Sequence, residues 1–147
     1  MKLNNIKIFN YRCFKEVEFD FDDHITLIVG KNGAGKTAIL DAVAVSVSTF
    51  LLGIDGSASR SILKDDARYE FHNLNGTIDP QHQFPVSIES TGDCLNQQNV
   101  KWIRSLNSES GKTTIKDAGE LTGLAKKAQN QIMTGDKSLV LPLISYY

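Results

Sequence analysis

The sequence predicts a mixed α/β domain with antiparallel strands, and three observations carry this prediction. Apolar and polar residues alternate near the N-terminus, as in half-exposed strands. A glycine-rich stretch then lies between an apolar, β-branched run and an apolar run of helical length. A second group of strand-like segments lies between residues 84 and 116. With 147 residues, of which 41% are hydrophobic, the chain has the size of one domain and enough apolar material for a core.

Residues 3–21 are expected to form the first two strands. Ile6 and Ile8 share one face of the first strand. In the second strand apolar and acidic side chains alternate: Val17, Phe19 and Phe21 against Glu16, Glu18 and Asp20. The acidic stretch 20–23 could be a metal site or a catalytic carboxylate pair. Such a pair follows a buried apolar strand, however, whereas these acids alternate or lie in a turn, so a solvated hairpin edge is favoured.

The next element is the stretch LIVGKNGAGKTAIL at residues 27–40, which matches the phosphate-loop pattern G-x-x-x-x-G-K-[ST] without substitution. The apolar run 25–29 before it is expected to be a buried strand. Residues 36–52 after it are expected to form a helix that Gly53 closes in a left-handed conformation. The motif therefore has the strand, loop and helix context that phosphate binding requires.

Each residue type in this loop has a chemical reason. Glycines let backbone N–H groups surround an anion, and the following helix points its positive end at the same place. Lys36 is expected to reach the β- and γ-phosphates, and the Thr37 hydroxyl to bind Mg²⁺. A purely structural turn does not require Lys and Thr at these places. The candidate nucleotide-binding residues are Gly30, Lys31, Asn32, Gly33, Ala34, Gly35, Lys36 and Thr37.

A polar connector is expected at residues 54–83, where Gly and Ser are frequent at the start and the later part leaves its structure open. His72, Asp79 and His82 could bind a metal, but scattered surface histidines are the favoured interpretation. Antiparallel strands follow at 84–90, 99–106 and 113–117, with Trp102 as the largest apolar contact. The second GKT, at residues 111–113, lacks the upstream glycine and has polar flanks, so it predicts a hairpin tip rather than a nucleotide site.

Two further elements complete the chain. Residues 118–135 carry apolar side chains at helical spacing before Gly135, namely Leu121, Leu124, Ala125, Ala128 and Ile132, and predict a helix. Residues 138–147, SLVLPLISYY, predict a buried strand.

Composition limits the partners and the compartment. The 16 Lys and Arg residues balance the 17 Asp and Glu residues, so the chain lacks the overall positive charge that would indicate nucleic-acid binding. Any contact with nucleic acid is therefore expected to be local. Cys13 and Cys94 lie in no C-x-x-C arrangement and are expected to be free thiols in a reducing compartment. No signal peptide or apolar run of about 20 residues is visible, which predicts a cytoplasmic protein without a membrane segment.

The N-terminal residues LNNIKIFNYRCFKEVEFDF, followed by ITLIVGKNGAGKTAILDAV, resemble the ATPase heads of the SMC, RecF and OLD group, the ABC-type ATPases that act on DNA. In this group the first strand ends in an N-F-R-like triplet, matched by Asn10, Tyr11 and Arg12, and the loop favours Asn at the position of Asn32. The resemblance covers residues 1–52. It implies an α/β P-loop NTPase fold, and the chain is expected to be the incomplete N-terminal lobe of an ABC/SMC-like head.

This lobe, residues 1–147, is expected to have three parts, of which the polar connector at residues 54–83 is the middle one. Residues 1–53 provide the strands, loop and first helix, and residues 84–147 the hairpin region, second helix and final strand. ATP and Mg²⁺ are the implied cofactors, Arg12 is placed beside the phosphates, and two heads form a homo-oligomer around ATP. The tail LVLPLISYY further resembles AAA-type ATPases of phage-defence systems, the Septu type included, which work with an HNH nuclease.

The expected function is therefore an ATPase whose nucleotide state gates a nuclease partner in a DNA-directed or antiphage complex. No Walker B strand, L-S-G-G signature or switch His is found, so no catalytic residue is assigned and hydrolysis is expected to need a C-terminal lobe. The alternative is a regulatory oligomerisation module that binds ATP with little hydrolysis. A kinase or GTPase is disfavoured, because neither an arginine-rich lid nor an N-K-x-D motif is present.

Overall fold

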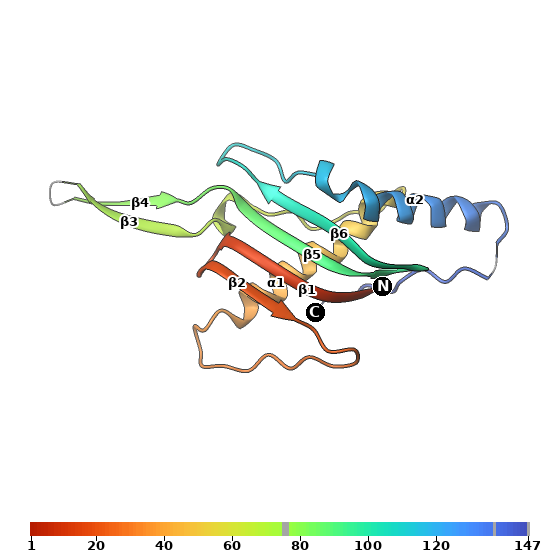
Figure 1. Ribbon diagram of the computed structural model, residues 1–147. Coiled ribbons are helices and arrows are strands. Elements are labelled where there is room, and N and C mark those ends of the chain that lie inside the picture. The colour runs from red at the N-terminus through yellow and green to blue at the C-terminus, as the bar shows by residue number, and fades with distance from the viewer. Residues whose placement is uncertain (75–76, 137, 147) are drawn as a thin grey trace.

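The structure is a computed structural model that describes residues 1–74, 77–136 and 138–146. A four-stranded antiparallel sheet has the order β2-β1-β5-β6 and carries two helices, α1 and α2 (Figure 1). A separate hairpin, β3-β4, projects from one end of this body (Figure 1). The strands are β1 Lys2–Tyr11, β2 Phe14–Asp20, β3 Tyr69–Leu74, β4 Thr77–His82, β5 Val86–Cys94 and β6 Gln97–Leu106. The helices are α1 Lys36–Ser48 and α2 Gly119–Met133, and the 3-10 turns are η1 Thr49–Gly53, η2 Lys64–Asp66 and η3 Lys116–Ala118.

The predicted N-terminal hairpin is confirmed. β1 and β2 pair in antiparallel register, with Ile8 opposite Val17 and Ile6 opposite Phe19. Both isoleucines are fully buried, whereas the acidic side chains of β2 are exposed. The alternation of apolar and polar residues in the sequence therefore predicts correctly which side chains lie on the buried face of the sheet and which on the exposed face.

The core lies between the sheet and the helices. One cluster joins the apolar face of α1 to β1 and β5, through residues that include Ala42, Val45 and Ile88. A second cluster joins β6 to α2, and Trp102 lies in it with 1% of its surface exposed. The indole Nε1 donates a hydrogen bond to the Ser46 carbonyl oxygen at 3.1 Å, which ties β6 to α1. The prediction that Trp102 supplies a large apolar contact is confirmed.

The first predicted helix ends differently from the expectation. α1 stops at Ser48 and continues as η1, and Gly53 has no left-handed backbone. A Cβ on Gly53 would lie 2.2 Å from the carbonyl oxygen of Thr122 in α2. Glycine is therefore needed at this position because η1 and α2 approach closely, not because the helix requires a cap.

Three predicted strands are not formed. Residues 25–29 belong to no strand in the described part of the chain, and Ile25, Leu27 and Val29 are at least three-quarters exposed. An apolar run becomes a buried strand only where a neighbouring strand satisfies its backbone. Residues 113–117 make one ladder-like bond, from the Thr114 N–H to the Ser105 carbonyl, before turning into η3. Residues 138–146 contain no strand, and Leu143 is almost fully exposed.

The helix predicted near the C-terminus is confirmed as α2, which buries Leu121, Ala125 and Ala128. The stretch Lys36–Gly53 is long and apolar enough to span a membrane by those two measures alone, but 56% of it is buried. Packing against the sheet accounts for that apolar composition.

Candidate functional site

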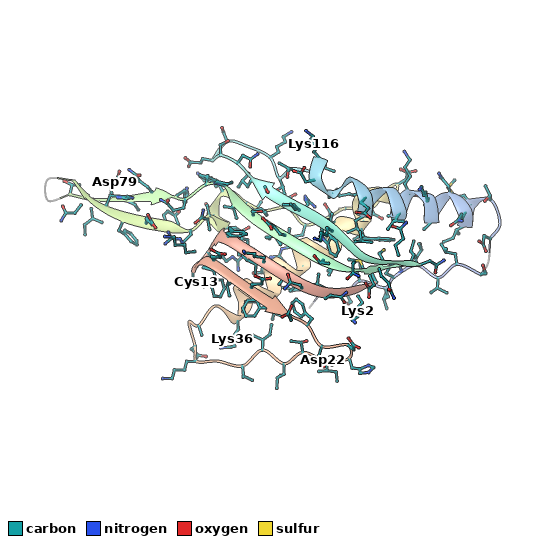
Figure 2. The ribbon with its side chains drawn as sticks, in the orientation of Figure 1. Lys2, Cys13, Asp22, Lys36, Asp79 and Lys116 are labelled. Atoms are coloured by element: carbon teal, nitrogen blue, oxygen red, sulfur yellow. The ribbon has the colours of Figure 1, made fainter. Side chains whose placement is uncertain are left out.

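The phosphate loop lies against the turn between β1 and β2. Gly33 and Gly35 have φ angles of 81° and 87°, which residues with a side chain rarely adopt. A Cβ on Gly35 would lie 2.5 Å from the Phe14 ring and 2.7 Å from Cys13 Sγ. Figure 2 shows Cys13 at this turn and Lys36 at the start of α1, on the same side of the molecule. The glycine at position 35 therefore serves both the left-handed loop and its close packing.

Carbonyl groups of the loop hold the Lys36 ammonium. Its Nζ donates to the carbonyl oxygens of Gly30 and Lys31, both at 2.8 Å. These neutral acceptors keep the positive charge inside the loop, where a phosphate oxygen is a stronger partner. The loop is also continuous with α1, because the Ile39 N–H donates to the Gly35 carbonyl at 3.0 Å.

A pocket of about 470 Å³ lies at the N-terminus of α1. Its lining residues are Arg12, Cys13, Asn32, Gly33, Gly35, Lys36, Thr37 and Ala38. The structure therefore brings Arg12 together with much of the sequence-predicted loop. Cys13, which follows Arg12 directly in the chain, was not among the residues predicted for the site. No carboxylate lines the pocket in the part of the chain that the structure describes, which fits a site for an anion.

Arg12 occupies the turn that follows β1, with a φ angle of 50°. Its backbone N–H donates to the Asp66 carbonyl at 2.7 Å, and its Nε to Asp66 Oδ1 at 2.8 Å. Its Nη1 forms an ion pair with Asp41 Oδ2. Arg12 thus lines the predicted phosphate pocket while two carboxylates hold its guanidinium.

Asp41 is a buried acid one helical turn after Thr37. Besides its pair with Arg12, Asp41 forms an ion pair through Oδ1 with Arg60 Nη2 at 2.7 Å, and the same oxygen accepts a hydrogen bond from the Tyr146 hydroxyl at 2.6 Å. Burial alone would raise the pKa of Asp41, but the Tyr146 hydrogen bond and the charges of Arg12 and Arg60 outweigh it and lower that pKa. The carboxylate is therefore ionised at neutral pH.

The acidic and histidine alternatives do not assemble. Asp22 Oδ1 accepts the His24 N–H at 2.9 Å, and Asp23 pairs with Lys2, so the acids at residues 20–23 order an exposed turn. The described residues contain no group of three His, Cys, Asp or Glu side chains that could hold a metal. Figure 2 places Asp79 on the projecting hairpin, away from Lys36.

Comparison with known proteins adds to this geometry. A model of the AAA domain family (AAA_23) matches residues 5–147. The DNA replication and repair protein RecF of Chlorobium phaeobacteroides (strain BS1) is 36% identical over 89 residues, covering 60% of this chain and 23% of that protein. The Retron Vc95 probable ATPase of Vibrio cholerae serotype O1 biovar El Tor is 23% identical over 154 residues, covering all of this chain and 27% of that protein. The chain thus spans about a quarter of the length of these curated relatives.

A solved structure of an SMC ATPase, described in terms of ATP-driven dimerization and DNA-stimulated activation, has a TM-score of 0.52 and 18% identity. The match covers 85% of this chain and 80% of that one. This likeness concerns the fold, and it confirms the predicted α/β class of an SMC-like head. Together with the sequence relatives, it confirms the resemblance to the SMC and RecF group. The Septu-type relationship stays a prediction.

Proposed function

Because the chain belongs to the AAA domain family, we propose that its phosphate loop binds ATP together with Mg²⁺. The observation that carries the proposal is the Lys36 ammonium, held inside a glycine-rich loop whose left-handed glycines leave a pocket at the N-terminus of α1. Backbone N–H groups and the helix dipole favour an anion there. Thr37 lines the same pocket and supplies the hydroxyl that would bind Mg²⁺ at the β- and γ-phosphates.

The test of nucleotide binding is calorimetry of ATP with Mg²⁺ on the full-length protein and its Lys36→Ala variant. Loss of a charge-assisted phosphate contact is worth about 1.5 to 3 kcal/mol, so affinity should fall roughly ten- to a hundredfold. The matched control is Lys112→Ala, which changes the lysine of the second GKT and should leave affinity unchanged. Equal ATP affinity in the Lys36 variant and the wild type would refute the assignment.

We further propose that the full-length protein hydrolyses ATP and that its nucleotide state gates a DNA-directed or antiphage complex in the cytoplasm. Homo-oligomerisation through the ATPase heads and an HNH-type nuclease partner, as in Septu-type systems, are parts of this proposal. The names of the RecF and retron relatives support the general role. Size-exclusion chromatography with and without ATP, followed by mass spectrometry of proteins that co-purify from the native host, tests the assembly. An ATP-independent monomer that never co-purifies with a nuclease would contradict it.

A second candidate function is a regulatory module that binds ATP with little hydrolysis. It is favoured by the absence of a carboxylate among the described residues that line the pocket, because hydrolysis needs a group that orients the attacking water. Phosphate release by the full-length protein separates the two candidates. Release that depends on Lys36 identifies an ATPase, whereas tight binding without release identifies the regulatory module.

A further inference from the structure

We propose that Asp41 is a positioning residue, which acts together with Asp66 to hold Arg12 in the orientation that contacts a nucleotide phosphate. The inference rests on the proposed nucleotide function of the loop and deepens it. Asp41 does not line the pocket itself, so its effect on the ligand is exerted through Arg12.

The geometry separates the held side of the guanidinium from its free side. Asp66 engages Nε and Asp41 engages Nη1 of Arg12. Within the described residues, Nη2 has no hydrogen-bond partner or ion pair, and about a third of the Arg12 side chain is exposed. Two carboxylates therefore fix the plane of the group and leave donors for a third oxygen acceptor. A fork of fixed geometry suits a phosphate oxygen.

The backbone fixes the same residue. The positive φ of Arg12 is unfavourable for a residue with a side chain, and the hydrogen bond from its backbone N–H to the Asp66 carbonyl holds it in place. Asp66 is fixed in turn, since its Oδ2 accepts the Leu63 N–H at 2.9 Å. A long, flexible side chain thus arrives at the pocket with much of its rotational freedom already lost, which reduces the entropy cost of binding.

The rest of the network maintains the charge of Asp41. Its other partners, Arg60 and Tyr146, both bind Oδ1 and leave Oδ2 to Arg12. Two arginines and two aspartates balance one another, so the network carries no excess negative charge that would repel a phosphate. The competing interpretation is an ion-pair network that stabilises the fold and has no effect on the ligand.

The test is a double-mutant cycle in the full-length protein, with Mg²⁺ and ATP affinity measured by calorimetry. Asp41→Asn keeps the shape of the side chain and removes its charge, and is expected to lower ATP affinity about three- to tenfold, since it weakens a charge-assisted contact of Arg12. In an Arg12→Ala background the same change should alter affinity less than about twofold, because the residue through which Asp41 acts is gone. Asp55→Asn is the matched control. It makes the same chemical change at a carboxylate that binds Gln129 in α2 and not Arg12, and should leave ATP affinity unchanged.

Arg12→Lys provides a second measurement that does not require Asp41 variants to fold. Lysine keeps the positive charge but cannot engage both carboxylates in a fixed plane, so ATP affinity should fall as far as in Arg12→Ala. Wild-type affinity in Arg12→Lys, or an equal effect of Asp41→Asn in both backgrounds, would overturn the positioning role. Loss of binding in Lys36→Ala shows that the loop itself works, so these outcomes judge Asp41 separately from the proposed function.

Discussion

Arg104 donates a hydrogen bond from Nη1 to the hydroxyl of Thr49 at 3.2 Å, although only 1% of its surface is exposed. Its Nε donates to the Thr114 carbonyl at 2.9 Å, and no carboxylate forms an ion pair with it among the described residues. Burial lowers the pKa of this guanidinium below its ordinary value. Among the described residues, β6 thus carries a buried charge that only neutral oxygens, of η1 and of the segment before η3, stabilise.

The effect of replacing Arg104 on the free energy of unfolding should therefore depend more on the volume of the new side chain than on its charge. Arg104→Ala leaves a cavity and two neutral acceptors without donors, which should lower the free energy of unfolding by about 3 kcal/mol. Arg104→Met fills most of the same space and carries no charge to desolvate, so we expect a loss of about 1 kcal/mol or less. Urea unfolding of the full-length protein measures both. Equal destabilisation by Ala and Met would show that the lost charge and hydrogen bonds, not the lost volume, set the stability.

Tyr11 should tolerate loss of its hydroxyl. The side chain is fully buried, and its hydroxyl has no hydrogen-bond partner among the described residues. Burial also raises the pKa of this phenol, so it stays neutral at any physiological pH. Tyr11→Phe removes an unsatisfied polar group and is expected to leave thermal stability unchanged or raise it by about 1 kcal/mol. A clear fall in the melting temperature would reveal a hydrogen bond that forms in solution.

Gly53 should not accept a side chain. The Cβ of Gly53→Ala would collide with the Thr122 carbonyl oxygen, and we expect a loss of about 2 kcal/mol or more as η1 and α2 move apart. Gly123→Ala, in α2, is the matched control, because its Cβ meets nothing within 4 Å. Helix propensity predicts a gain of about 0.5 to 1 kcal/mol there. Thermal unfolding that ranks the two variants in the opposite order would contradict the close packing.

Protonation of Asp41 should make the stability of the folded chain fall at acidic pH. The pKa of Asp41 in the folded chain is lowered from 3.8, so the folded state binds its proton more weakly than the unfolded state. The stabilisation is therefore complete above the unfolded pKa and is lost as the pH falls through the folded one. Urea unfolding between about pH 6 and pH 3 should show a smaller loss of stability for Asp41→Asn than for the wild type. Parallel curves for the two proteins would exclude this linkage.

The features predicted correctly from the sequence are those that depend on the spacing of residues close together in the chain. The phosphate loop depends on residues within one turn of chain, and the β1-β2 hairpin on an alternation that Ile6 and Ile8 display. The strand expected at residues 25–29 depends on a neighbour that short-range patterns do not specify. For that reason the alternating residues of β5 gave a correct strand, whereas the apolar run at residues 25–29 gave an incorrect one.

The missed part of the site depends on long-range pairing. Asp66 lies 54 positions after Arg12, and nothing in the spacing of the chain joins them. Asp41 did leave a signal, because it is the one charged residue between Thr37 and Ser48 in an otherwise apolar or small-residue helix. A lone acid at such a place is costly unless a cation meets it, and in the structure Arg12 and Arg60 are those cations.

Because the two thiols differ in exposure, Cys13 can be labelled selectively with a fluorescent dye. Cys13 is exposed at the mouth of the phosphate pocket, whereas Cys94 is buried. Burial also raises the pKa of Cys94, which keeps it as the unreactive thiol. Within these 147 residues a maleimide dye would therefore attach next to the phosphate loop without any engineered label site, and nucleotide occupancy could be followed in real time through its emission.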